Sequence, residues 1–255
     1  MNTFAKPMIG SQIDPQHPLS QGCVMALLML EGSGNRTYDL THNGNDGVFQ
    51  NGPLWKPGRN GAAIEFDGSN DYVDLGNPAS LNITKGITIE GQICPNTAGG
   101  NRYGRWLSKN GVPLVCGMLL GPRTYCTLID SSNTLHQINS NVDSVPYHQW
   151  SHIMVTWDGK IQKQYVNNIC QDQTKSWSGS LKITANDLYV GNRVARDRGF
   201  DGLISDVRIW DRALSPDEVQ DLYINPYGFI YQPQKYWLMP QGVTIPPHLL
   251  FRRVA

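Results

Sequence analysis

The sequence predicts an all-β protein, built as a two-sheet antiparallel sandwich with one short helix. About a dozen short β-branched or aromatic runs follow one another at roughly ten-residue spacing, separated by Asn-Gly and Asp-Gly turn pairs. Charged residues make up only 16% of the chain, whereas it has 26 Gly and 16 Pro. This composition suits a β protein with many loops. No strand–helix–strand unit of roughly 30 residues appears, which excludes a doubly wound fold.

The first part of the chain contains an arm and three early strands. Residues 1–20 are rich in Pro and lack periodicity, so we expect an extended N-terminal arm. The continuous apolar run at residues 23–30 predicts a strand buried on both faces. Residues 62–66 and 71–75 flank an Asp-Gly-Ser-Asn turn, and we predict that they form a hairpin.

The middle of the chain supplies the other strands. Residues 86–94 alternate Ile and Gly with polar side chains, as a half-buried strand should. Residues 150–157 (WSHIMVTW) are the strongest strand candidate, and an Asp-Gly turn leads from them into residues 160–166. Further strands are expected at residues 105–108, 115–120, 125–129, 134–138 and 188–190.

One helix follows the last long strand, which is predicted at residues 203–210. Ser215 is a good N-cap, Pro216 suits the first helical position, and Asp217 and Glu218 place acids in the first turn. These signals predict a helix near residues 215–223, with one apolar face. We expect this helix to plug one open end of the sandwich.

Composition argues against several classes of partner. The 21 basic and 21 acidic residues balance, so no positive field attracts nucleic acid. The sequence contains no run of 18 apolar residues, so we predict no membrane helix, and we do not interpret the N-terminus as a signal peptide.

The five cysteines lack CxxC spacing, so we expect free buried thiols in a protein made in a reducing cytoplasm. Cys116 and Cys126 are the one pair expected to face each other across a hairpin.

Several motifs occur in an order that resembles one protein superfamily. They are residues 63–73 (AIEFDGSNDYV), 149–159 (QWSHIMVTWDG), 164–168 (QYVNN) and 200–219 (FDGLISDVRIWDRALSPDEV). Together they resemble the laminin-G-like, concanavalin-A-like lectin/glucanase jelly-roll superfamily, in its short pentraxin-like branch. The resemblance covers residues 21–224, which we predict as one domain between an N-terminal arm at 1–20 and a C-terminal arm at 225–255.

The resemblance implies one structural calcium ion near the acidic turns. Its expected ligands in this sequence are Asp39, Asp67, Asp71 and Asp206, because calcium prefers several carboxylate and carbonyl oxygens. Ser205 stands where the family usually carries a second acid. The alternative is that these aspartates cap turns through hydrogen bonds to their own backbone.

Glycan binding is the second property to consider. Tyr103, Trp106, Tyr147 and Trp177 lie near predicted loops and are the candidates for stacking on a sugar ring. The alternative is that each ring packs in the core or at a sheet edge. Residues 193–198 (RVARDR) form a local charge cluster, which we interpret as a solvated or interface loop.

No catalytic residue is predicted. The alternating acids of related glucanases are absent, GxSxG and HExxH do not occur, and the six His residues are dispersed. We therefore expect a protein that is not an enzyme.

The C-terminal arm combines many aromatic residues with five prolines, which exclude a long helix. Disordered tails avoid so many aromatics, so the arm is expected to dock on its own sandwich or on another subunit. The expected docking residues are Tyr227, Phe229, Tyr231, Tyr236, Trp237, Leu249 and Phe251.

Two functions follow as hypotheses. The first is a non-enzymatic virion structural protein of a phage, such as a capsid decoration, head-fibre or tail component. It would be made in the host cytoplasm, and its partners would be other virion subunits or its own oligomer. The alternative is a carbohydrate-binding lectin or adhesin module, calcium-dependent, at a bacterial surface or outside the cell. Neither hypothesis includes a nucleic acid or a membrane as partner.

Overall fold

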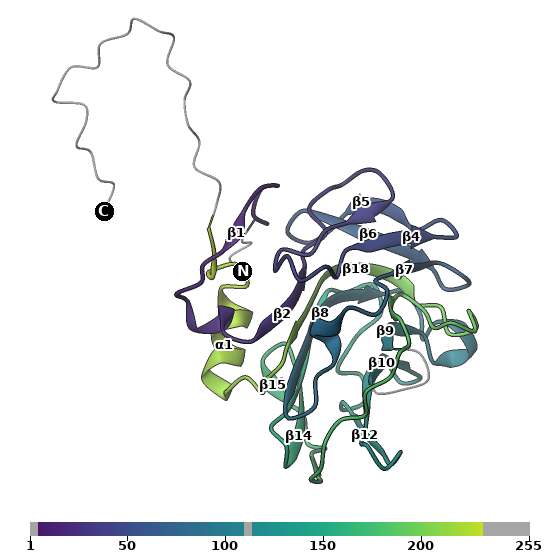
Figure 1. Cartoon of the computed structure of the whole chain (residues 1–255). Helices are drawn as coiled ribbons and strands as arrows, with labels where there is room; N and C mark the ends of the chain where they lie inside the picture. The colour runs from purple at the N-terminus through teal and green to yellow at the C-terminus, as the bar shows by residue number, and fades with distance from the viewer. Residues whose placement is uncertain (1–4, 110–113, 232–255) are drawn as a thin grey trace, which may run out of the picture.

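A computed structural model describes residues 5–109 and 114–231 of the chain. Two antiparallel sheets face each other, and a helix and a small strand pair lie beside them (Figure 1). The predicted all-β sandwich with one α-helix is confirmed.

The first sheet has nine strands. Its main path is β15 (Ile169–Cys170), β14 (Ile161–Val166), β13 (Ser151–Trp157), β8 (Ile87–Pro95), β18 (Asp201–Trp210), β6 (Ala62–Asp67) and β5 (Leu54–Pro57). Off this path, β16 (Lys175–Ser176) pairs with β14, and β2 (Cys23–Leu27) pairs with β18.

The second sheet has eight strands. Its order is β12 (Leu135–Asn139), β11 (Arg123–Ile129), β10 (Leu114–Leu119), β9 (Arg105–Lys109), β17 (Leu188–Val190), β7 (Tyr72–Asp74), β4 (Gly47–Gln50) and β3 (Arg36–Thr37). Short 3-10 helices in the connections are η1 (Pro18–Ser20), η2 (Ala79–Leu81) and η3 (Gly100–Arg102).

The main core lies between the two sheets. Alternating side chains of each strand point inward, such as Ile89 and Ile93 of β8 and Ile153 of β13. Each such buried aliphatic side chain contributes about 1.5–3 kcal/mol. Trp106 fills the space opposite Gly91, where a Cβ atom would lie only 2.8 Å from its ring. Gly91 is therefore required by the tryptophan.

The predicted hairpin of residues 62–66 and 71–75 is wrong. β6 pairs with β18 and β5 in the nine-stranded sheet, whereas β7 pairs with β17 and β4 in the eight-stranded sheet. The turn after β6 therefore crosses from one sheet to the other. The same turn residues suit a hairpin and a crossing, so sequence alone did not separate them.

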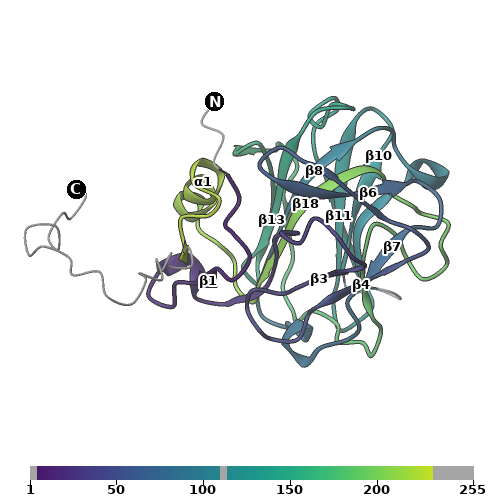
Figure 2. The same ribbon diagram turned by 90° about the horizontal axis from the view of Figure 1, so that it is seen from above.

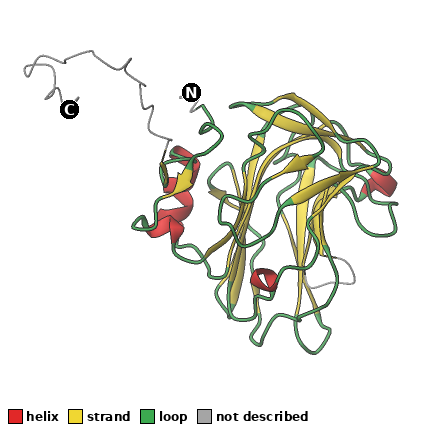
Figure 3. Cartoon of the chain, turned by 45° about the horizontal axis from the view of Figure 1, so that its top comes forward, coloured by secondary structure: helices red, strands yellow, loops and turns green. Residues whose placement is uncertain are grey.

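A second hydrophobic layer covers the outer face of the nine-stranded sheet. Helix α1 (Pro216–Ile224) places Val219 and Leu222 against Met154 and Trp210, which point away from the main core. Figure 2 shows α1 on the side of β13 and β18, and Figure 3 shows it as a separate red helix beside the strands. The helix therefore covers a sheet face and does not plug an open end.

The start of α1 has the predicted chemistry. The Ser215 hydroxyl accepts a hydrogen bond from the Glu218 amide at 3.3 Å, and the Glu218 carboxylate accepts one from the Ser215 amide at 2.9 Å. This reciprocal pair is a capping box.

Segments from both ends of the chain complete this second layer. β1 (Gln12–Ile13) pairs with β19 (Ile230–Tyr231), and Leu19 is buried in the layer. Tyr227 and Phe229 are buried there too, so this part of the C-terminal arm docks on its own sandwich. Tyr231 is 56% exposed. The packed unit thus extends beyond residues 21–224 at both ends. The other expected docking residues, Tyr236, Trp237, Leu249 and Phe251, lie outside the described residues.

Cys116 and Cys126 face each other on β10 and β11, as expected for a hairpin. Their sulfur atoms are 3.0 Å apart in the buried core, and both thiols are free. Among the described residues, no helix has the length and apolar character to cross a membrane.

Candidate functional site

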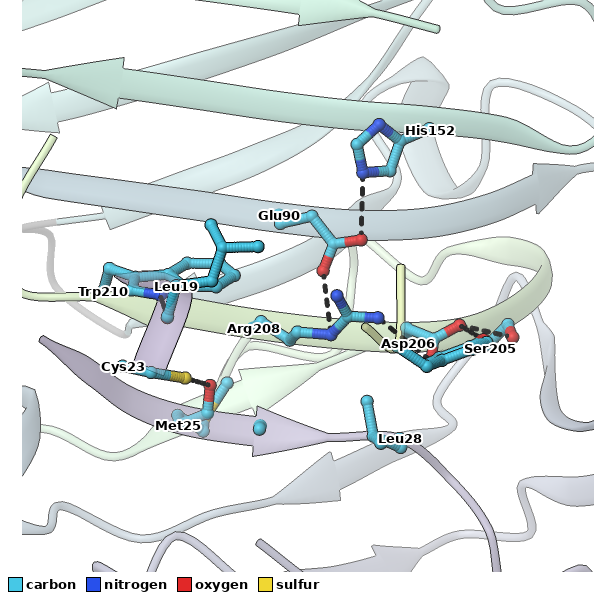
Figure 4. Close-up of polar contacts among 12 residues, drawn as sticks. Leu19, Cys23, Met25, Leu28, Glu90, His152, Ser205, Asp206, Arg208 and Trp210 are labelled. Atoms are coloured by element: carbon cyan, nitrogen blue, oxygen red, sulfur yellow. Dashed lines mark hydrogen bonds and ion pairs between the residues drawn. The ribbon is translucent and has the colours of Figure 1, made fainter. Parts of the chain in front are cut away.

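A buried ionic cluster lies between the nine-stranded sheet and the second layer. Its centre is Arg208 of β18, whose Nε is 3.5 Å from Glu90 and whose Nη2 is 3.6 Å from Asp206 (Figure 4). His152 contacts the other Glu90 oxygen at 3.1 Å. The side chains of Arg208, Glu90 and Asp206 are fully buried.

Lys6 of the N-terminal segment joins this cluster. Its ammonium group donates to the carbonyls of Leu28, Ala62 and Ser205 at 2.5–2.7 Å and lies 3.9 Å from Asp206. The Arg208 guanidinium also lies 5.5 Å from the centre of the Tyr227 ring, as a cation–π contact. The cluster therefore attaches both terminal segments to the sheet.

Burial and neighbouring charges shift the pKa values of the groups in this cluster in opposite directions. Burial alone would raise the pKa of Glu90, but the charge of Arg208 and the hydrogen bond from His152 outweigh it and lower the pKa. Burial lowers the pKa of Lys6, although Asp206 acts in the opposite direction. Because Arg208, Glu90 and Asp206 are fully buried and contact one another, we interpret the cluster as structural.

The four aspartates predicted to bind calcium do not form one site. Asp39 caps its own turn: its oxygens accept hydrogen bonds from the amides of Ala26 and Thr41 and from the Asn45 side chain. Asp206 belongs to the buried cluster. Within residues 5–109 and 114–231, no group of three or more His, Cys, Asp or Glu side chains is arranged to hold a metal ion. Asp39 and Asp206 therefore do not join Asp67 and Asp71 in one arrangement, while calcium binding itself stays a prediction.

Asp67 and Asp71 remain together at the end of β6. Asp71 accepts a hydrogen bond from the Asp67 amide at 3.2 Å. Burial, and then the nearby Asp67 carboxylate, raise the pKa of Asp71 to about 6. Both line a hollow of about 260 Å³, here called the acidic hollow; its other polar lining residues are Asn51, Glu65, Asn96 and Asp201.

Three of the four predicted sugar-stacking rings are packed against the protein. Trp106 is fully buried in the main core, so its expected place at a surface loop is wrong. Trp177 stacks on Trp157 at 4.0 Å and on His136 at 3.9 Å between ring centres. Tyr147 is half-buried against the same core.

The fourth ring, Tyr103, is 47% exposed and lies at a groove on the outer face of the eight-stranded sheet. We name this hollow of about 230 Å³ the tyrosine–arginine groove. Its lining residues are Tyr103, Arg105, Val115, Tyr125, Thr127, Leu135, Gln137 and Arg198.

Strand alternation creates the floor and far wall of this groove. Cys116 of β10 and Cys126 of β11 point into the core, so Val115, Tyr125 and Thr127 point outward. The Tyr125 ring lies over Gly117, where an added Cβ would come within 2.7 Å of it. Thr127 donates a hydrogen bond to Gln137 of β12 at 3.2 Å.

Two loops form the near wall. Residues 96–104 and 191–199 are joined by backbone hydrogen bonds from Gly100 to Gly199 and from Arg105 to Arg198, both 2.8 Å long. Arg198 also donates to the Asn101 carbonyl at 3.1 Å. Its guanidinium lies 4.9 Å from the centre of the Tyr103 ring. The loops therefore hold an arginine and an exposed tyrosine together.

The second arginine, Arg105, is half-buried in the groove. Its Nη1 donates to the Ser108 hydroxyl at 3.0 Å. Burial lowers the pKa of Arg105, and Tyr125 acts in the opposite direction. Burial likewise raises the pKa of Tyr125, against the influence of Arg105.

Sequence reasoning found only one residue of this groove, Tyr103. It missed Arg105, Tyr125 and Gln137. It noted Arg198 only as part of the charge cluster at residues 193–198, which it interpreted as a solvated or interface loop. The alternation within residues 115–119, 125–129 and 134–138 was the available signal for which side chains share the outer face. Nothing in the sequence indicated that residues 96–104 lie against residues 191–199.

The comparison with known proteins agrees with the fold. The model of the concanavalin A-like lectin/glucanases superfamily matches residues 67–220, which is more than half of the chain. No curated protein matches.

Several solved structures share the architecture. The binding domain of Paraclostridial Mosquitocidal Protein 1 is 17% identical, with a TM-score of 0.67 over 81% of this chain and 53% of that one. Domain 4 of AbnA, a GH43 extracellular arabinanase from Geobacillus stearothermophilus, was solved with arabinotriose. It is 15% identical, with a TM-score of 0.62 over 84% of this chain and 98% of that one. The botulinum neurotoxin serotype D ligand-binding domain was solved with N-acetylneuraminic acid. It is 14% identical, with a TM-score of 0.62 over 80% of this chain and 50% of that one.

The chain spans about half the length of these toxin binding domains. At such identities the similarity shows the fold alone. With the family match, it establishes that the chain belongs to the concanavalin A-like lectin/glucanases superfamily.

Proposed function

We propose that this protein is a carbohydrate-binding module without catalytic activity, and that it binds sugars in the tyrosine–arginine groove. The observation that carries this proposal is the exposed Tyr103 ring beside a polar groove on a rigid sheet. Sugar sites combine an aromatic surface with a few fixed polar groups, and the groove offers Thr127 and Gln137 for hydroxyl groups.

The groove suits this role better than the acidic hollow. Among the described residues that line the acidic hollow, Phe66 is the one aromatic residue, and it is buried, so it does not offer a ring for stacking. Solved relatives of the same fold were determined with arabinotriose and with N-acetylneuraminic acid, which adds support for a sugar ligand.

The described lining of the groove also lacks the pair of carboxyl groups that a glycosidase uses. Hydrolysis of a glycosidic bond uses two carboxyl groups that flank it. No Asp or Glu is among the described residues that line the groove. This supports binding without turnover.

Replacing Tyr103 by Ala tests the proposal. We expect affinity for a sugar identified on a glycan array to fall about tenfold or more, because stacking and the ordering of Arg198 are both lost. Tyr38, which is 51% exposed on a different loop, supplies the matched control as Tyr38→Ala. Isothermal titration calorimetry measures both. Equal binding by wild-type protein and Tyr103→Ala would place the sugar elsewhere, and an array without any bound glycan would refute the function.

A virion structural role is the second candidate, as a capsid decoration, head-fibre or tail component with other virion subunits as partners. It draws on the aromatic arm, of which Tyr227 and Phe229 already pack on this chain. The test is therefore a chain that ends at Tyr231, which keeps these anchors. If this chain still assembles with the same partners as the full chain, the remaining arm does not anchor the protein.

The calcium prediction reduces to Asp67 and Asp71. We propose titration of calcium into the wild-type protein and Asp71→Asn, with sugar binding measured in calcium and in chelator. Location at a virion, a bacterial surface or outside the cell stays a prediction.

A further inference from the structure

We infer that the tyrosine–arginine groove selects sugars that carry an oxyanion, either a carboxylate or a sulfate ester. This inference rests on the proposed function of the groove as a sugar site, and it adds the chemical class of the ligand.

The charged residues that line the groove, Arg105 and Arg198, are both basic, although the whole chain is neutral. The two loops at residues 96–105 and 191–199 contain five arginines and one acid, Asp197. Asp197 is already paired with Arg193, whose Nη2 donates to its carboxylate at 2.6 Å. Positive charge at Arg105 and Arg198 is therefore left without a bound carboxylate from these loops.

Arg105 is the more informative of the two arginines because it is half-buried. Among the described residues, no salt bridge joins Arg105 to a carboxylate, and the nearby charges of Arg193 and Arg198 are of the same sign. A partly desolvated charge without a counter-ion destabilises the free protein, even where, as here, one of its donors binds a neutral hydroxyl. An oxyanion in the groove would supply that partner and recover part of the desolvation cost on binding.

Arg198 is placed to recognise the same group from the rim. Its contacts with the Asn101 carbonyl and the Tyr103 ring restrict the guanidinium before any ligand arrives. A restricted guanidinium binds carboxylate or sulfate oxygens through paired hydrogen bonds with little further loss of entropy. Tyr103 would then contact the sugar ring while the arginines contact its charged substituent.

Two acids of this sheet, Asp74 and Asp187, lie at or beside β7 and β17, outside the lining of the groove. Asp74 and Asp187 act on Tyr189, and Tyr189 and Asp74 belong to β17 and β7, which follow β9 in the sheet on the side away from β10. The acidic hollow is a separate site that would repel the same ligands. Of the groove and the acidic hollow, the groove is therefore the one that favours an anionic sugar.

Matched pairs of sugars test this inference. The pairs are tetragalacturonate with galactotetraose, sialyllactose with lactose, and a sulfated with an unsulfated galactose disaccharide. Calorimetry is run at low salt and repeated with added NaCl, which screens charge contacts. We expect at least one acidic member to bind about tenfold or more tightly than its neutral partner, and to weaken with salt. Comparison of the carboxylated pairs with the sulfated pair shows whether the groove recognises a carboxylate or a sulfate ester.

Three variants locate the effect. Arg198→Gln is expected to remove the preference for the acidic member, and Arg198→Lys to retain part of it because the charge stays. Arg36→Gln removes the same charge from exposed β3, at the other edge of this sheet, and should bind like wild type. Thermal unfolding followed by circular dichroism shows that each variant is folded.

The outcomes separate the inference from the proposed function. If neutral and acidic members bind equally, or if Arg36→Gln weakens binding as much as Arg198→Gln, the inference is overturned while sugar binding stands. If no sugar of either kind binds the folded protein, both fail.

Discussion

At the scale of single residues, the aspartates of the predicted metal segments have three different environments. Asp39 accepts hydrogen bonds from its own turn, and Asp206 is a counter-ion of buried Arg208. Asp71 is buried beside a second carboxylate, so its pKa is raised to about 6. The turn-capping alternative anticipated the role of Asp39, whose partner Thr41 is only two residues away. The roles of Asp71 and Asp206 were not identified, because the burial of a side chain depends on how distant segments of the chain pack together.

The Asp71 environment predicts a pH dependence of stability. The pKa of an unfolded aspartate is about 4. The folded pKa is higher, so the folded protein binds more protons between the two values. Its free energy of unfolding should therefore fall as pH rises from about 4 to about 6, and stay lower above that.

The substitution Asp71→Asn should remove this loss of stability at higher pH, because asparagine does not ionise. We expect a higher melting temperature than wild type at pH values above the folded pKa, and a much smaller difference in acid below both pKa values. Asp221→Asn on exposed α1 is the control. An equal shift of the Asp71→Asn melting temperature at both pH values would contradict the explanation.

At the scale of elements, the near wall of the groove depends on glycines where two loops meet. A Cβ atom on Gly199 would lie 2.5 Å from the Gly68 carbonyl carbon and 2.7 Å from the Ser69 nitrogen. These are backbone atoms, so the loop itself must move to accept a side chain. Arg198, the next residue, would move with it.

Gly199→Ala should therefore reduce both stability and sugar binding. We expect a loss of about 1–3 kcal/mol in the free energy of unfolding, as for other overpacked sites. Gly86→Ala is a milder control, because its closest contact is 3.3 Å from the Trp157 carbonyl oxygen. Chemical denaturation and calorimetry measure the two effects. Unchanged binding in a destabilised Gly199→Ala would show that the groove does not need this loop contact.

The elements also show how far the sequence could be interpreted. Alternation located most strands, and the cap residues at Ser215 and Glu218 located α1, because both signals are local. The sheet that receives a strand is not a local property, which is why the β6–β7 hairpin was wrong. The proximity of Arg105 and Arg198 was missed for the same reason, since it depends on the packing of two distant loops.

At the scale of the whole molecule, the sandwich and its second layer are joined by buried charge. Lys6 binds the carbonyls of Leu28, directly after β2, of Ala62 in β6 and of Ser205 in β18, and its side chain is only 4% exposed. Breaking one member of a buried ionic cluster leaves other polar groups without partners, at a cost of about 3–5 kcal/mol.

Lys6→Ala is thus expected to destabilise the protein by that amount and to expose the N-terminal segment to proteases. Lys56→Ala provides the comparison, since its 3.3 Å pair with Glu65 is solvent-exposed and should contribute about 1 kcal/mol or less. Denaturant titration gives both values. Similar losses in the two variants would mean that the buried cluster does not hold the segment.

The pairing of β1 with β19 has a consequence for how copies of this protein would act together. Both described ends of the chain lie beside α1, on the outer face of the nine-stranded sheet, and the groove opens on the opposite sheet. A support that held the protein at residue 5 or at residue 231 would therefore leave every groove facing outward. Neighbouring copies on such a support would engage one polymer at a high effective concentration, so weak single contacts would combine into strong avidity.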